Sequence, residues 1–115
     1  MKYLLMIYGN EAAMKTASKA DNDQMLAAYG AYIEAMTKAG VALGRNRLQP
    51  STSATTVRVT NGKTQVLDGP YAETKEQLGG YLLIDVPDLD TALSWAARCP
   101  GASHGVMEVR PIWEM

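Results

Sequence analysis

Four short segments of the chain carry the hydrophobic patterns of β-strands. Residues 2–8 and 80–86 are apolar at nearly every position and too short for a helix, which is typical of central strands covered on both faces. Residues 106–112 are predicted to form the last strand, and residues 45–50 a shorter one.

A longer segment after the first strand carries apolar residues at helical spacing. They are Met25, Leu26, Tyr29, Tyr32, Ile33 and Met36. Asp21 is predicted to cap this helix, with Gln24 reaching back, and Gly40 to end it in a left-handed conformation. Gly30 costs up to about 1 kcal/mol relative to Ala, so we expect it to pack closely against another element. Residues 11–20 lack such a stripe and are predicted to be a loop or a marginal helical turn.

A second amphipathic helix is predicted after strand 80–86. Asp88 is a suitable cap for its first turn, and Pro100-Gly101 is predicted to halt it. Its predicted apolar face consists of Leu89, Ala92, Leu93 and Ala96.

Residues 55–67 show the pattern of a β-hairpin. The β-branched run 55–60 is followed by Asn61-Gly62, the strongest short hairpin signal in a sequence. A turn at these two residues sets Thr60 opposite Lys63, Arg58 opposite Gln65, and Val57 opposite Val66. This register pairs apolar with apolar and polar with polar residues, which supports it.

The order of these elements predicts an α+β domain of the ferredoxin-like βαββαβ type with an extra hairpin. The length of 115 residues fits a single domain spanning residues 1–115. In such a fold both helices lie on one face of an antiparallel sheet. Strands 2–8 and 80–86 are nevertheless apolar on both faces, which would leave a larger apolar patch than monomers expose. We therefore expect a homodimer in which a second subunit covers that face.

The composition excludes several classes of protein. The chain is 47% apolar and 20% charged with a net charge of -1, and no block of positive charge offers a surface for direct nucleic-acid binding. The apolar run at residues 3–8 is too short for a signal peptide or a membrane helix. We therefore expect a cytoplasmic protein without membrane contact.

Cys99 and His104 are the one cysteine and the one histidine of the chain. They can form neither an internal disulfide nor a structural zinc site of the usual Cys/His type, and we expect no metal or other cofactor. A buried, small apolar role is favoured for Cys99 over a surface thiol. His104 is placed in the loop before the last strand, as a solvent-facing or locally bonded side chain rather than a catalyst.

Several motifs along the chain match one family. They are Arg47-Leu-Gln-Pro50, Ala54-Thr-Thr-Val-Arg58, Asp68-Gly-Pro-Tyr-Ala-Glu-Thr-Lys-Glu76 with Leu78-Gly-Gly80, Ala96-Ala-Arg-Cys-Pro100, and Glu108-Val-Arg-Pro111. The sequence resembles the YCII-related family, in the subgroup named for its Asp-Gly-Pro-Phe motif, with Tyr71 in place of the Phe. The resemblance implies a dimeric α/β barrel and a role in regulation or stress response, since members are often encoded beside extracytoplasmic-function sigma factors.

A catalytic dyad proposed for some YCII-related proteins does not transfer to this chain. It uses a His in the first helix and an Asp before a Pro after the second helix. Here the first helix has no His, and Cys99 precedes Pro100.

The segment between the hairpin and strand 80–86 contains the candidate catalytic residues Asp68, Glu73 and Glu76 and the candidate ligand-binding residues Tyr71 and Lys75. Polar residues on a loop held by strands are a common way to present a binding site. The alternatives are structural: the Asp68 carboxylate can bond the following amides in a turn, and residues 73–76 can be a solvated helical turn. Both alternatives stay open from the sequence.

Three arginines complete the set of candidate ligand-binding residues. Arg47 and Arg58, predicted on neighbouring strands, are suited to grip a carboxylate or phosphate because of the forked guanidinium donors. Arg110 shares a strand face with Glu108. This pair is either a buried structural salt bridge, which we slightly favour, or the anion-binding floor of a cleft.

Two functions are consistent with these residues. The first is binding of a small polar or anionic molecule in a cleft of the dimeric barrel, with any catalysis being acid-base chemistry by carboxylates. The second is a non-catalytic regulatory or interaction protein linked to a sigma factor. Convergent polar groups around a ligand-sized space would favour the first, and a filled apolar interior the second.

Overall fold

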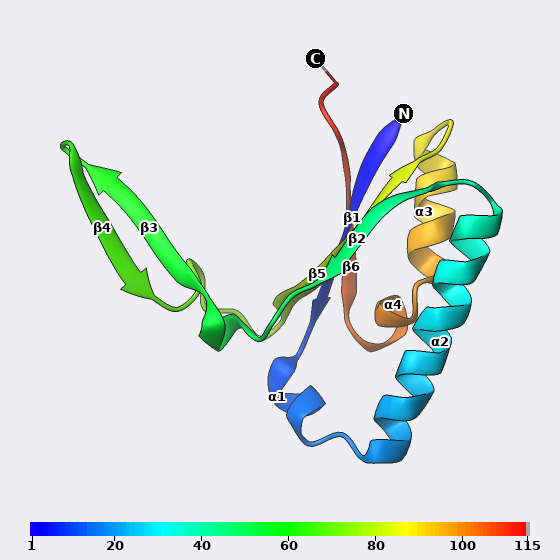
Figure 1. The fold of residues 1–115 in the computed structure, drawn as a ribbon, viewed down its shortest axis with the longest axis horizontal. Coiled ribbons are helices and arrows are strands. Elements are labelled where there is room, and N and C mark those ends of the chain that lie inside the picture. Colours follow the sequence, from blue (N-terminus) through cyan, green and yellow to red (C-terminus); the bar gives the residue numbers. More distant parts are fainter. Residues whose placement is uncertain (115) are drawn as a thin grey trace.

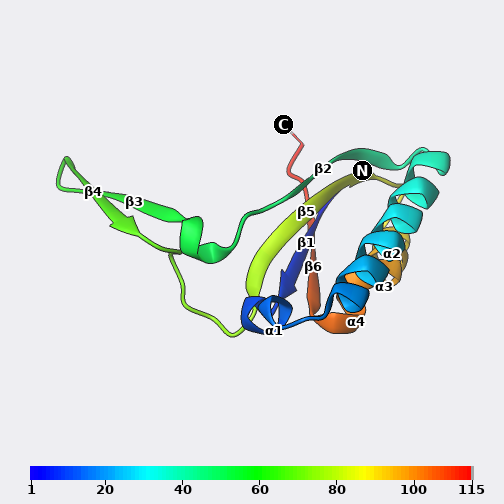
Figure 2. The same cartoon turned by 60° about the horizontal axis from the view of Figure 1, so that its bottom comes forward.

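A computed structural model describes residues 1–114 and places a four-stranded antiparallel sheet at the centre (Figure 1). Its strands, in spatial order, are β2 (Ala42–Arg47), β5 (Gln77–Asp85), β1 (Lys2–Gly9) and β6 (Val106–Pro111). Helices α2 (Lys19–Lys38) and α3 (Leu89–Arg98) lie together on one side of this sheet, as Figure 2 shows. The α+β class is confirmed, and the strand order is compatible with a ferredoxin-like fold.

The core lies between the sheet and these two helices. Tyr3 and Leu5 of β1 and Ile84 of β5 point toward the helices and are almost fully buried. The Tyr32 hydroxyl of α2 donates to the Trp95 carbonyl of α3 at 2.6 Å, and their rings meet edge to face. This bond satisfies the polar tip of a buried tyrosine while its ring joins the two helices.

The first long helix begins earlier than the sequence predicts. Its cap is Ser18, whose Oγ accepts from the Asp21 amide, so the prediction that Asp21 is the cap is wrong. Both residue types are good caps, and the earlier one adds a turn of helix. The helix ends as predicted, with Gly40 at a φ of 73°. Part of the preceding segment forms a short helix, α1 (Glu11–Lys15), capped by Asn10.

The expectation of close packing at Gly30 is also wrong. A Cβ at this position would meet no atom within 4 Å in the described part of the chain. Gly30 therefore has no packing explanation within one molecule.

The second long helix starts at the predicted cap, Asp88. Its buried face differs, because Trp95 is buried with Ala92 and Ala96, whereas Leu89 and Leu93 are about half exposed. The Pro100-Gly101 pair follows the end of α3 but also opens another short helix, α4 (Pro100–His104), with the proline at the first position. Proline lacks only an amide that has no helical partner there, so it can start a helix as readily as stop one.

Two strands are shifted relative to the sequence prediction. Strand β2 covers Ala42–Arg47 rather than residues 45–50, and β5 starts at Gln77 rather than at residue 80. The Leu48 amide bonds the Gly79 carbonyl, so the pairing of β2 with β5 extends into the polar segment that the sequence assigned to a connection. Backbone hydrogen bonds between the strands thus keep residues 77–79 in a β-strand although their sequence shows no strand pattern.

Strands β3 (Thr55–Thr60) and β4 (Lys63–Asp68) form a separate two-stranded sheet, here called the hairpin arm. The predicted register is confirmed, including Val57 opposite Val66. Asn61 and Gly62 have φ values of 51° and 76°, as the favoured two-residue hairpin turn requires. In both views the arm projects from the sheet on the side away from α2 and α3 (Figures 1 and 2).

The sheet surface opposite the helices, here called the bare face, carries apolar side chains. Alternation from the buried Tyr3 and Leu5 places Leu4 and Met6 of β1 on it, and cross-strand pairing adds Tyr81 and Leu83 of β5. Within residues 1–114, no helix covers this face (Figure 2). The apolar character of both faces is confirmed, and the second subunit stays a prediction.

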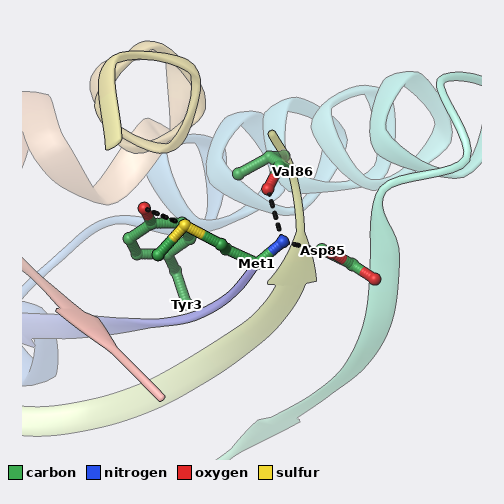
Figure 3. Close-up of polar contacts among 4 residues, drawn as sticks. All are labelled: Met1, Tyr3, Asp85 and Val86. Carbon is green, nitrogen blue, oxygen red and sulfur yellow. Dashed lines mark hydrogen bonds and ion pairs between the residues drawn. The ribbon is translucent and has the colours of Figure 1, made fainter. Parts of the chain in front are cut away.

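Polar contacts of Met1 hold the N-terminal end of β1 (Figure 3). The Met1 amino group donates to Asp85 Oδ1 at 3.0 Å and to the Val86 carbonyl at 2.9 Å. Because the Asp85 side chain is half exposed, this ion pair contributes little stability and serves mainly to register β1 against β5.

Candidate functional site

The candidate residues Asp68 and Tyr71 lie where the hairpin arm returns toward the body. Gly69, at a φ of 104°, turns the chain here. Its amide donates a hydrogen bond to the Ala54 carbonyl, and its carbonyl accepts one from Thr56 Oγ1. The hydrogen bonds found among residues 1–114 include none to the Asp68 carboxylate. The hypothesis that Asp68 holds the turn is therefore wrong, and this exposed carboxylate is available for another partner.

A shallow depression of about 190 Å³ lies on one face of the arm. It is lined by Thr56, Arg58, Gln65, Leu67, Asp68, Pro70 and Tyr71. The Arg58 guanidinium carbon stands 5.7 Å from the centre of the Tyr71 ring, a cation–π geometry. Arg58 and Asp68 border the same space, yet the ion pairs of the described chain include neither. The depression thus offers one cation, one carboxylate and one aromatic ring to solvent.

A second, more open depression of about 530 Å³ shares Asp68 and Pro70 with the first. It is lined by Ser51, Thr52, Asp68, Gly69, Pro70, Ala72, Glu73, Thr74 and Gln77. Asp68 borders both depressions, and Glu73 borders this one. Residues 73–76 are irregular, with a bend at 75–76, rather than the helical turn considered from the sequence, and Thr74 Oγ1 donates to the Glu76 carbonyl.

A clasp that the sequence did not reveal holds this region to the body. Both Glu11 carboxylate oxygens accept from Ser51, one from its amide at 2.7 Å and one from its hydroxyl at 2.6 Å. The Glu11 amide in turn donates to the Gln77 side chain at 3.0 Å. Because these residues lie 40 and 66 positions apart, no local pattern could have joined them.

Arg47 and Arg58 do not lie on neighbouring strands, contrary to the sequence-based interpretation. Arg47 belongs to β2 of the four-stranded sheet, whereas Arg58 belongs to the separate hairpin arm. The prediction failed because the hairpin leaves the main sheet instead of continuing it. Arg58 is thus the arginine that lines the smaller depression, and Arg47 lines neither.

Arg110, Lys75 and Glu76 also stand outside the linings of both depressions. Arg110 bonds Glu108 on β6, so the salt bridge expected from the sequence is present, but both side chains are exposed and the expectation of a buried pair is wrong. Whether any of these residues binds a ligand stays a prediction.

Cys99 is buried, as expected, and its thiol lies 3.7 Å from the Tyr29 hydroxyl. Burial raises the pKa of the Cys99 thiol, which keeps it protonated and unreactive. Burial likewise raises the pKa of Tyr29. His104 is the exposed last residue of α4, not part of a loop.

The searched part of the chain, residues 1–114, holds no group of three or more side chains arranged to ligate a metal. Among the same residues, no helix combines the length and the apolar character needed to cross a membrane.

These features define a small α+β protein with an antiparallel sheet, a projecting hairpin and open depressions at the base of that hairpin. The chain belongs to the YCII-related family, since the YCII-related domain matches residues 1–115. It is also 40% identical over 114 residues to the uncharacterized protein R00369 of Rhizobium meliloti (strain 1021), across 97% of this chain and 92% of that protein. The family resemblance inferred from the motifs is confirmed.

Proposed function

We propose that this YCII-related protein binds a small anionic molecule in the depression between the hairpin arm and residues 70–71. The observation that carries the proposal is Arg58, which borders this space without an ion-pair partner among residues 1–114. Its forked donors suit a carboxylate or a phosphate, and the Tyr71 ring beside it suits a planar group of the ligand.

The proposal extends to acid-base chemistry if the ligand is a substrate. Asp68 is the best-placed carboxylate because it borders both depressions, and Glu73 borders the larger one. Asp68 could exchange a proton with a ligand held by Arg58, whereas Glu73 could do so only with a ligand that extends into the larger depression. Glu76 would need a change in the connecting segment to reach either space, because it lines neither.

The ligand site would belong to a homodimer that forms a dimeric α/β barrel. The support is the bare face, where Leu4, Met6, Tyr81 and Leu83 share one partly exposed surface that no helix among residues 1–114 covers. A second copy would bury this patch and convert two open sheets into one closed barrel.

The binding proposal is tested by thermal shift with a panel of dicarboxylates and phosphomonoesters. We expect at least one probe to raise the melting temperature, because a ligand that binds the folded state stabilises it. Arg58→Gln should abolish the shift, whereas Arg45→Gln, at an exposed position outside both depressions, should keep it. A panel without any shift, or a shift that survives Arg58→Gln, would refute the site.

A second candidate function is a non-catalytic interaction protein that acts with a sigma factor. It is favoured by the open shape of both depressions and by apolar side chains exposed on the arm. Titration calorimetry with a purified extracytoplasmic-function sigma factor from the same organism tests a physical link, and an absence of binding heat at two temperatures would argue against it.

A further inference from the structure

The hairpin arm has an exposed apolar side opposite the ligand depression. Val57, Val59 and Val66 point to this side, here called the valine face, and are 60%, 64% and 59% exposed. The other side carries Arg58 and Leu67 and is partly covered by Tyr71. The Leu67 side chain on that other side is 65% exposed as well, so neither side of the arm is buried by its own chain. The valine face is the side with the larger group of apolar side chains.

An arm of this kind is poorly stabilised by its own chain. It forms a two-stranded sheet that shares no strand with the central sheet, and isolated two-stranded hairpins are at best marginally stable in water. Leaving three valine side chains on one side of a hairpin exposed to water is also unfavourable in free energy, since burying each would stabilise the protein. Another surface is needed to hold this arm.

The surface area of the chain shows how far it departs from a compact monomer. The accessible surface is 8207 Å², whereas a compact monomer of this mass exposes about 6100 Å². The excess of about 2100 Å² is larger than the roughly 800 Å² that each partner buries in a standard interface, so the extended chain has enough surface for one. The radius of gyration, 16.1 Å against about 13 Å for a compact domain of this length, shows the same extension.

The direction of the arm identifies the occupant. The arm leaves the body on the side of the sheet away from the helices in both views, which is the side of the bare face (Figures 1 and 2). A second copy stacked on the bare face therefore lies within reach of the arm.

We propose that the valine face packs against the second copy of this chain, so that the hairpin arm of each protomer contacts the other protomer. This inference rests on the homodimer proposed above and adds a second contact to it. Two-fold symmetry makes the contact reciprocal, because the same patch is used by both copies. The depression at Arg58 and Tyr71 then lies next to the subunit boundary, and dimerisation orders the ligand site.

The test compares variants by sedimentation equilibrium of the full-length chain. Val57→Thr, Val59→Thr and Val66→Thr are combined, since threonine keeps the β-branched shape while making the face polar. The matched control, Gln65→Thr with Leu67→Thr, alters the opposite side of the same two strands. Leu83→Gln on the bare face tests the sheet contact separately, and circular dichroism establishes that each variant is folded.

We expect the triple valine variant to raise the dimer dissociation constant at least a hundredfold and the control to change it less than fivefold. If the valine variant leaves the dissociation constant unchanged while Leu83→Gln raises it, the arm contact is refuted and the sheet dimer stands. If the wild type is a monomer at micromolar concentration, both proposals fail. If the valine variant does not fold, amide exchange of the wild type decides: protection of residues 55–68 that is lost on dilution supports the arm contact, and concentration-independent protection refutes it.

Discussion

The two adjacent glycines of the Leu78-Gly-Gly80 motif are predicted to differ sharply in their tolerance of a side chain. A Cβ at Gly80 would stand 2.8 Å from the Asn46 carbonyl oxygen and 3.4 Å from Arg47 Cα, both backbone atoms of β2. A Cβ at Gly79 would meet only the Ile7 carbonyl oxygen, at an ordinary 3.8 Å. Gly80→Ala therefore forces β2 away from β5, whereas Gly79→Ala does not.

The cost of Gly80→Ala follows from how firmly β2 is held. The Leu48 amide bonds the Gly79 carbonyl, and the Asn46 side chain bonds the Tyr81 hydroxyl at 2.7 Å, so β2 is pinned on both sides of the contact. Overpacking of this kind costs about 1–3 kcal/mol, offset by roughly 0.5–1 kcal/mol from the reduced backbone entropy of alanine in the unfolded chain. We expect a net loss of about 1–2 kcal/mol, or a melting temperature lower by about 4–8 °C.

Thermal unfolding followed by circular dichroism measures this difference, with all proteins at one concentration because a dimer is more stable at higher concentration. Gly79→Ala is the matched control and should melt within about 2 °C of the wild type, as for changes within ±0.5 kcal/mol. Equal melting temperatures for Gly80→Ala and the wild type, or equal losses for the two variants, would refute the steric reasoning.

Three further predictions concern the turn, the clasp and the buried thiol. Gly62→Val, at a φ of 76° in open space, should cost the arm about 1–2 kcal/mol and raise its amide exchange by mass spectrometry while the body stays protected; a uniform effect would contradict the separate arm. Glu11→Gln should lower the free energy of unfolding in urea by about 1 kcal/mol, because one of the two bonds to Ser51 loses its acceptor, and an unchanged midpoint would count against the clasp. Burial raises the pKa of the Cys99 thiol above its ordinary 9.0 and that of Tyr29 above 10.0, so the unfolded chain releases these protons first. Stability should therefore be fully present below about pH 9 and fall above it, with Cys99→Ala delaying the decline; a flat profile from pH 8 to 10.5 would contradict it.

The sequence alone was sufficient for features that depend on neighbouring residues. The hairpin register followed from Asn61-Gly62 and from matching side chains across the turn, and the cap of α3 at Asp88 followed from its own first turn. The apolar character of both faces of β1 followed from its composition. The start of α2 was missed by three residues because Ser18 and Asp21 are both good caps, and local preference does not choose between them.

The residues of the candidate site could be predicted only in part from the sequence. Asp68 and Tyr71 were predicted from one motif, and the structure brings Arg58 to them because the Gly69 turn folds the chain back onto the arm. The pairing of Arg47 with Arg58 was wrong, since nothing in either strand indicates that the hairpin leaves the main sheet.

Only the tertiary structure decided which of two adjacent glycines must lack a side chain, which carboxylate holds Ser51 and which side of the arm borders the smaller depression. Gly79 and Gly80 differ through the approach of β2, and Glu11 differs from Glu73 through its contact with Ser51. Periodicity and turn chemistry report on residues a few positions apart, where the backbone itself sets the geometry. Contacts between distant segments depend on how the sheet and the arm assemble, and no local sequence pattern predicts that arrangement.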